Sequence, residues 1–182
     1  TKRLKTEIDG WPSLGGREIS KEDIRNTKKR LGPKEEIIKA FAQYPFFFAI
    51  SLLFTNYAIY IKDIENKTVD IIRWWEITKV SYENEHFMFF NSEGKIFKNI
   101  NIRTFFPRGA SMPTGVCFSE GLTFVASIAP NPLQLAQENK YSEAIEAINY
   151  YITIESSIEL YVTRAFIYYD RAIKSNDNKN LL

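Results

Sequence analysis

Cysteine and histidine are almost missing from this chain of 182 residues, which holds one of each. A lone cysteine, Cys117, excludes a disulfide within the chain and a zinc site built from cysteines. No neighbouring residue supplies a base to activate its thiol, so we expect Cys117 to be inert. The single histidine, His86, lacks the further ligands that a metal ion needs. We therefore predict no cofactor, no metal site and no enzymatic activity.

Long apolar runs and a strong excess of one charge are also missing. The longest apolar run, residues 45–54, is about half of what a membrane-spanning helix needs. The formal net charge is only +2, and the basic triplet Lys28, Lys29 and Arg30 would spread around a helix instead of lining one face. We predict no nucleic-acid partner, because phosphate-backbone binding requires a basic stripe. The sequence likewise carries no strong membrane signal.

The use of cysteine also bears on location. A single cysteine fits a reducing compartment, so we expect a cytoplasmic protein. The first residue is Thr1 and not methionine. We therefore expect the natural start, and any export signal, to lie outside this sequence.

Aromatic residues are abundant, at 15% of the chain, with ten Tyr and fourteen Phe. Large rigid rings favour a dense core or an aromatic-lined groove. The remaining composition, with 45% hydrophobic and 25% charged residues, is typical of a globular protein.

The first 130 residues predict helices followed by strands. Glycines and prolines around Trp11 indicate an irregular start over residues 1–19. Ser20 is a suitable N-cap for a helix that ends near Leu31, and Pro33 is suited to begin a second helix over residues 34–43. Short apolar stretches separated by turn residues then predict an antiparallel meander with a clear hairpin around Gly94. The predicted strands are residues 47–54, 57–63, 68–74, 79–82, 86–91 and 95–102. A loop over residues 106–115 and a helix over residues 116–129 complete this part.

Three stretches of this part, KEEIIKAF, LLFTNYAIYIKD and WWEITKV, resemble bacterial proteins with a pleckstrin-homology-like fold. The resemblance covers residues 20–129. It implies a twisted, nearly closed antiparallel sheet with one end plugged by a C-terminal helix, and residues 116–129 are well placed to be that helix.

The C-terminal part has a helical period. One apolar stripe comprises Tyr141, Ala144, Ile145, Ile148 and Ile152, and a second comprises Tyr161, Ala165 and Tyr168. The spacing predicts two adjacent helices in which alanines of one face aromatic rings of the other. These stripes resemble tetratricopeptide repeats, which implies a protein or peptide partner. The segment amounts to one and a half repeats, so we expect either further repeats after Leu182 or a short tail packed on the first domain.

The predicted fold class is therefore α+β, in three parts. Residues 1–19 form an irregular segment. Residues 20–129 form the pleckstrin-homology-like domain, with an N-terminal helical pair and a capping helix. Residues 130–182 form an incomplete αα-hairpin of tetratricopeptide type.

These observations lead us to expect a non-enzymatic adaptor or scaffold that binds a protein or peptide. An inhibitor or immunity-type protein that blocks one toxin or enzyme is the alternative, and an enzyme using carboxylates such as Glu76 or Glu83 is a third. One of two adjacent tryptophans is expected in the core, and the other is either an anchor for a partner or is covered by a helix or loop. The C-terminal tyrosines exceed what two short helices can bury, so they are expected either to pack on the first domain or on further repeats, or to line a ligand groove. The candidate binding residues are Trp74, Trp75, Tyr150, Tyr151, Tyr168 and Tyr169. The identity of the partner and the oligomeric state stay open.

Overall fold

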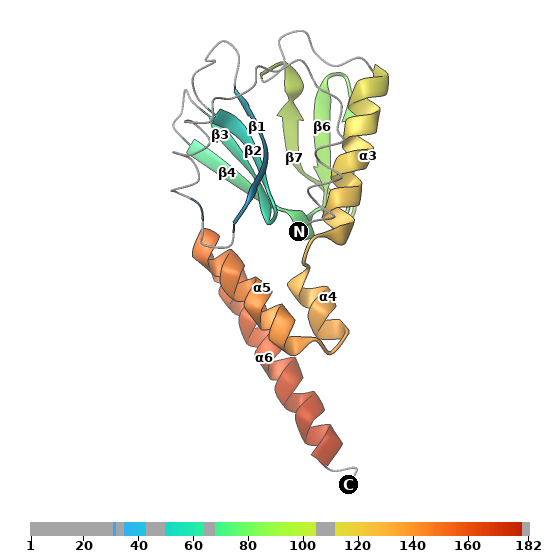
Figure 1. Cartoon of the computed structure of the whole chain (residues 1–182). Helices are drawn as coiled ribbons and strands as arrows, with labels where there is room; N and C mark the ends of the chain where they lie inside the picture. Colours follow the sequence, from blue (N-terminus) through green and yellow to red (C-terminus); the bar gives the residue numbers. More distant parts are fainter. Residues whose placement is uncertain (1–30, 32–34, 43–49, 64–67, 105–111, 180–182) are drawn as a thin grey trace. The chain divides into compact units, whose positions relative to one another are not determined.

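The computed structural model describes residues 31, 35–42, 50–63, 68–104 and 112–179 (Figure 1). The chain divides between Ala129 and Pro130 into two parts, which we call unit 1 and unit 2. The predicted irregular segment 1–19 and nearly all of the first predicted helix, residues 20–31, lie outside the described residues.

Unit 1 contains two antiparallel sheets. The first has the strand order β1-β2-β3-β4 and the second the order β5-β6-β7. The predicted meander is confirmed, because every predicted strand overlaps an observed one. Inward and outward side chains alternate as a strand requires, so that Phe87 and Phe89 of β6 are buried while Met88 is not. The strands are β1 (Ile37–Ala42), β2 (Ile50–Thr55), β3 (Ala58–Asp63), β4 (Thr68–Arg73), β5 (Lys79–Glu83), β6 (His86–Phe90) and β7 (Ile96–Asn101).

The predicted helix over residues 34–43 is wrong, because this stretch contains strand β1. Its antiparallel partner is β2, with Ala40 opposite Leu53. A helix of about ten residues is marginal by itself, and β-branched residues such as Ile37 and Ile38 suit a strand. Pairing with the neighbouring strand β2 therefore decides the conformation of this stretch. The residues of the stretch alone do not reveal that pairing.

The chain passes from one sheet to the other at a short 3₁₀ helix, η1 (Trp74–Glu76). The predicted strand 68–74 therefore ends one residue early, at Arg73. The Trp74 side chain is fully buried. Its indole Nε1 donates to the Thr55 carbonyl oxygen at 2.8 Å, and its ring stacks on Phe54 with the centroids 6.2 Å apart. Across the turn, the Arg73 backbone N–H donates to the Glu76 carboxylate at 3.2 Å.

Helix α3 (Met112–Ile128) lies along the second sheet (Figure 1). Phe118, Leu122 and Val125 enter a core shared with both sheets. The Val80 backbone N–H donates to Thr123 Oγ1 at 2.8 Å, so the helix satisfies a donor of edge strand β5. The helix begins earlier than predicted, so the predicted loop is wrong over residues 112–115. A proline in the first turn, Pro113, suits a helix start.

Unit 2 consists of the helices α4 (Pro132–Gln137), α5 (Tyr141–Ile154) and α6 (Ile158–Lys179). Asn131 caps α4, because its Oδ1 accepts from the backbone N–H groups of Leu133 and Gln134 at 3.0 and 3.2 Å. Ala144 and Ile148 of the predicted stripe on α5 are buried. A three-residue connection makes α5 and α6 antiparallel neighbours. None of the described helices is both long enough and apolar enough to cross a membrane.

Replacing Gly115 with alanine should destabilise unit 1 by about 1–3 kcal/mol, even though alanine favours a helix by about 1 kcal/mol over glycine. A Cβ at this position would lie 2.2 Å from the Tyr82 ring, and that ring packs against Phe87 at 5.3 Å between centroids. Urea unfolding followed by tryptophan fluorescence measures the effect. All three tryptophans (residues 11, 74 and 75) belong to unit 1.

The matched control is the same substitution in a Tyr82→Val background. Removing the ring removes the obstacle, so Gly115→Ala should there be neutral or stabilising. A stabilising effect of Gly115→Ala in the parent chain would show that helix propensity, and not contact with Tyr82, governs this position.

Candidate functional site

The residues with catalytic potential are dispersed through unit 1. Among the described residues, no group of three or more His, Cys, Asp or Glu side chains could hold a metal ion. The His86 ring is held on β6 by a 2.8 Å hydrogen bond between its Nδ1 and Asn99 Oδ1. Cys117 is exposed on α3.

A buried carboxylate, Glu35, is bound within the fold. Its Oε1 accepts hydrogen bonds from Thr55 Oγ1 and from the Tyr60 hydroxyl, both at 2.7 Å. Thr55 Oγ1 also accepts from the Ala58 backbone N–H at 3.1 Å. These bonds tie the residue that precedes β1 to the turn between β2 and β3. A buried polar group needs such partners, so we assign Glu35 a structural role.

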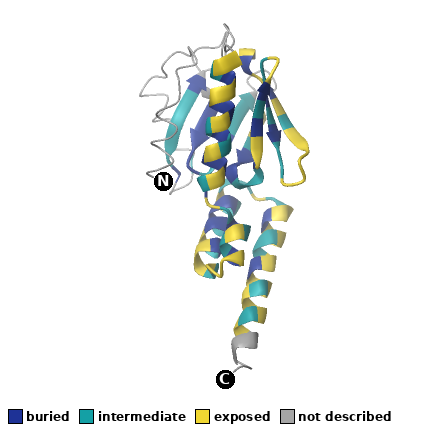
Figure 2. Ribbon diagram, turned by 90° about the vertical axis from the view of Figure 1, so that its right-hand side faces the viewer, coloured by how far each residue is buried: buried dark blue, intermediate teal, exposed yellow. Residues whose placement is uncertain are grey.

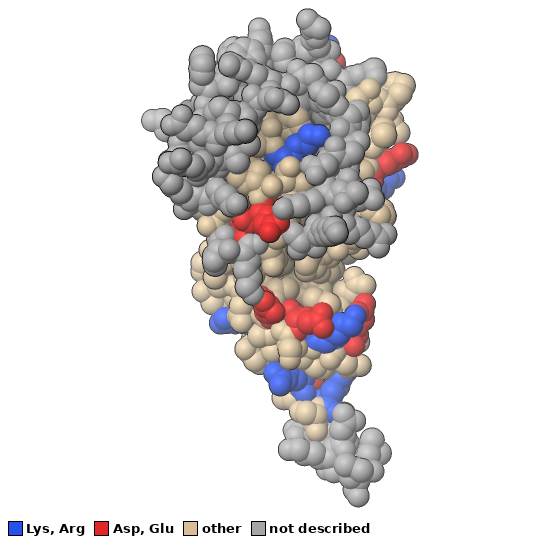
Figure 3. All heavy atoms as spheres, viewed as in Figure 1, with Lys and Arg blue, Asp and Glu red and all other residues tan. Residues whose placement is uncertain are grey.

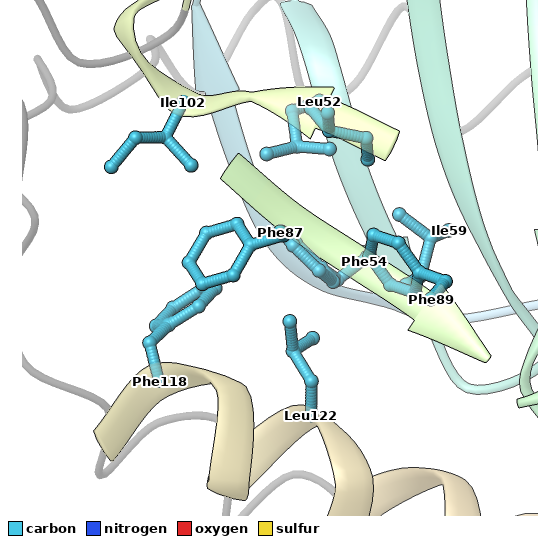
Figure 4. Close-up of a pocket in the computed structure, with 9 residues that line it drawn as sticks. Leu52, Phe54, Ile59, Phe87, Phe89, Ile102, Phe118 and Leu122 are labelled. Atoms are coloured by element: carbon cyan, nitrogen blue, oxygen red, sulfur yellow. The ribbon is translucent and has the colours of Figure 1, made fainter. Parts of the chain in front are cut away.

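An apolar cavity of about 10 Å³ lies inside unit 1 (Figure 4). Its volume is at the lower limit for a single water molecule. The side chains around it come from both sheets and from α3, and Phe118 and Leu122 point from the helix toward the strands. Since none of the lining residues is polar, the cavity resembles a packing gap and not a substrate pocket. The lining residues are Leu52, Phe54, Ile59, Phe87, Phe89, Ile100, Ile102, Phe118 and Leu122.

The most unusual surface among the described residues lies on α6. Figure 2 shows exposed positions recurring along α6. Over Ile158–Ile173, those on one half of the helix carry only apolar and aromatic side chains, which we call the α6 outer face. At 100° per residue, these side chains cover about half of the helix circumference without a charged residue among them. The exposed fraction of the large ones ranges from 41% for Ile173 to 80% for Ile158. The α6 outer face comprises Ile158, Tyr161, Val162, Ala165, Phe166, Tyr168, Tyr169, Ala172 and Ile173.

The opposite half of α6 faces α5. Leu160 and Ile167 are buried there. The Arg164 Nη1 donates to Asn149 Oδ1 of α5 at 3.0 Å. This arrangement corrects the prediction that Tyr161, Ala165 and Tyr168 pack against the first helix, since these three residues lie on the exposed side.

A second polar contact between the two helices involves Asp170. Its carboxylate accepts from the Tyr141 hydroxyl at 2.7 Å and pairs with Lys174 at 3.2 Å. The hydrogen bond from Tyr141 is the main reason that the pKa of Asp170 lies below its ordinary value, and Lys174 adds to this effect. The pKa of Lys174 is raised, first by its hydrogen bond with Tyr141 and then by Asp170. These charges therefore stabilise the hairpin and stay off the α6 outer face.

The predicted binding residues fall into two groups. Tyr168 and Tyr169 lie on the α6 outer face, with exposed fractions of 47% and 65%. Tyr150 and Tyr151 are buried, and Trp75 is half-buried on η1. Trp74 belongs to the core of unit 1. Of the six predicted binding residues, Tyr168 and Tyr169 are therefore the ones that are well exposed.

The sequence contained a signal for the orientation of α6 that the stripe analysis missed. Leu160 and Ile167 are seven residues apart, and Arg164, Asp170 and Lys174 fall on the same half of the helix. Long charged side chains beside an apolar pair suit a polar hairpin contact. The uncharged half is consequently the one without a partner inside the hairpin.

Charge does not single out another surface on the face drawn in Figure 3, where acidic and basic side chains of unit 2 lie interspersed. Ion pairs such as Lys140 with Glu138 (2.7 Å) account for part of this mixing. Interspersed charges give no extended field of one sign for binding a polyanion.

Replacing Asp170 with asparagine should lower the thermal stability of unit 2 at pH 7. The folded-state pKa of Asp170 is depressed, so its ionised form stabilises unit 2 above the ordinary aspartate pKa. That contribution is lost as the pH falls through the lowered value. The difference between parent and variant should therefore shrink as the pH falls below the ordinary aspartate pKa. Far-UV circular dichroism of the full chain measures the transition, and tryptophan fluorescence reports unit 1 separately.

Glu120→Gln, which removes an exposed carboxylate from α3 in unit 1, is the control and should leave the transition of unit 2 unchanged. An Asp170→Asn effect that is equally large at pH 2 and pH 7 would contradict a role for the ionised carboxylate.

Comparison with known proteins adds no family to these observations. No protein-family model, no curated protein and no solved structure matches the chain. The functional argument therefore depends on the chemistry of the α6 outer face.

Proposed function

We propose that this chain is a non-enzymatic protein-binding module, an adaptor or scaffold, and that it binds through the α6 outer face. The observation that carries the proposal is the extent of that face, with seven large apolar side chains exposed on one helix. Exposed apolar patches larger than a few hundred Å² are uncommon on soluble monomers and mark interaction sites. Tyrosine and phenylalanine also suit an interface, because they bring large contact areas and few rotatable bonds.

The pattern of α6 supports the same proposal. Leu160 and Ile167 are apolar on the side facing α5, and the α6 outer face is apolar on the other side. A helix that is apolar on both sides is normally covered on both sides. Helix α5 covers only the side of α6 that carries Leu160 and Ile167. A protein partner could cover the α6 outer face.

We further propose that unit 1 has a pleckstrin-homology-like fold. In support, a four-stranded and a three-stranded antiparallel sheet are followed by a helix that packs on them. For unit 2 we propose a tetratricopeptide-like arrangement, supported by the succession of a short helix and two longer antiparallel helices. Helical-repeat units bury their faces against neighbours and bind proteins, which agrees with the proposed role of α6.

Site-specific photo-crosslinking tests the proposed function. A benzophenone amino acid in place of Tyr169 should form covalent adducts with protein when the full chain is irradiated in an extract of the cells that make it. The reason is that the residue lies in the middle of the proposed contact. Gel electrophoresis and mass spectrometry of the adducts measure the outcome, and adducts with a second copy of the chain count as protein adducts.

The matched control carries the same amino acid at Val69 of β4, which is comparably exposed at 51%. Adducts should be severalfold fewer there. Equal yields at both positions, or none at position 169, would count against the α6 outer face as a protein-binding surface.

A further inference from the structure

We propose that the α6 outer face binds the same face of a second copy, so that two α6 helices lie antiparallel across a two-fold axis. This inference rests on the proposed function, because it names the partner of that same surface. Three properties of the face carry it: the spacing of its residues, the distribution of large and small side chains, and its area.

The spacing is that of a helix-to-helix seam. Ile158, Val162, Ala165, Tyr169 and Ala172 follow one another at intervals of four, three, four and three residues. This is the interval pattern of the a and d positions at which two helices interlock. The residues beside the seam are also apolar, with Tyr161 and Tyr168 along one edge and Phe166 and Ile173 along the other.

The distribution of large and small side chains selects the antiparallel direction. In a parallel pair, Tyr169 would oppose Tyr169 and Ala165 would oppose Ala165, which gives layers of very unequal width. An antiparallel pair with its two-fold axis near Ile167 places Tyr169 over the partner's Ala165. In the same register, Val162 lies over the partner's Ala172. Large side chains then meet small ones in each layer, as close packing requires.

The same register pairs the edges of the seam. Phe166 approaches Phe166 of the second copy along one edge, and Tyr168 approaches Tyr168 along the other, because both residues lie within one position of the axis. Aromatic pairs contribute beyond the area that they bury. The interface is therefore complementary to itself, as a two-fold axis demands.

The area is sufficient for a stable dimer. Four aromatic side chains of about 150–250 Å² each, exposed to roughly half, and three aliphatic ones present an area on the order of 800 Å². That value matches the roughly 800 Å² per partner of a standard protein interface. The nine residues carry no charge, so two identical faces can meet without opposing like charges.

The charged residues of α6 lie outside the seam, with the exposed Glu159 bordering Phe166 and the Arg164 guanidinium 5.1 Å from the Tyr161 ring centroid. Arg164 binds Asn149, and Asp170 binds Tyr141 and Lys174. A different protein partner is usually selected by charges arranged to complement its own. The α6 outer face is uncharged, and its large side chains lie over small ones of an identical face in the antiparallel register. A second copy of the chain therefore fits it better.

Sedimentation of the full chain tests the inference. The mass should be twice 21.2 kDa at micromolar concentrations and above. Phe166→Glu places two carboxylates next to each other across the axis, so its dimer dissociation constant should rise at least about 100-fold. Val69→Glu, at an exposed position of unit 1, is the matched control and should leave the dimer intact. Circular dichroism should show both variants folded.

Disulfide trapping tests the direction of the helices independently of the charge variants. In a Cys117→Ser background, which has no other cysteine, Ala165→Cys chains mixed with Tyr169→Cys chains should oxidise to a mixed covalent dimer, because these two positions face each other in the antiparallel register. Ile158→Cys should not, because two copies of this residue would lie roughly 27 Å apart along the antiparallel helices, far beyond disulfide reach.

Three results would overturn the inference. They are a chain that stays monomeric at protein concentrations up to about 100 micromolar, a dimer that survives Phe166→Glu, and a covalent dimer of the Ile158→Cys variant. A monomer that still yields adducts with another protein at position 169 would leave the proposed function standing. A monomer without any protein adduct at that position would remove both.

Discussion

The arrangement of unit 1 depends on how one side chain, Trp74, is held where the chain leaves one sheet for the other. Its indole N–H donates to the Thr55 carbonyl oxygen and its ring stacks on Phe54, so the start of the second sheet is fixed to the turn after β2. Since the side chain is fully buried, the indole nitrogen must have such a partner. An ion pair between Lys98 of β7 and Asp70 of β4 provides a second link between the sheets. The contacts of Trp74 thus fix how the two sheets meet at η1, and the shared core with its small cavity lies between them.

Unit 2 is governed by a different constraint, since α6 has more apolar surface than its hairpin can cover. The contacts with α5 use Leu160, Ile167 and the polar groups around them. What remains is a face of apolar and aromatic residues in water, whose burial is favourable by roughly 25 cal/mol per Å². Association costs several kcal/mol of translational and rotational freedom, and a face of this extent can offset that cost. The exposure of α6 is thus a driving force for association.

How well the sequence predicted each element depended on whether its cause was local. The hairpins were predictable because their turns carry local signals, such as Gly94 and Asn84 with positive φ angles. Strand β1 was not, because its apolar residues fit a helix as well as a strand, and only pairing with β2 decides between them. The end of β4 at Arg73 depends on the hydrogen bond from the Trp74 indole to the distant Thr55 carbonyl oxygen. Two of the candidate binding residues, Tyr168 and Tyr169, are exposed, but the periodicity could not orient α6, because a helix apolar on both sides has two equivalent stripes.

The polar groups of the two units explain why the functional surface is expected on unit 2. Among the described residues of unit 1, two polar side chains are bound inside the fold: Glu35 holds two hydroxyl groups, and Thr123 satisfies an edge donor of β5. In unit 2, polar contacts likewise hold the hairpin together, but they gather on one half of α6 and leave the other half without charge. A surface of that kind carries no charge by which a different partner could be selected. The separation of charge from the exposed half of α6 is therefore the property that makes association of this chain with itself the simplest way to cover it.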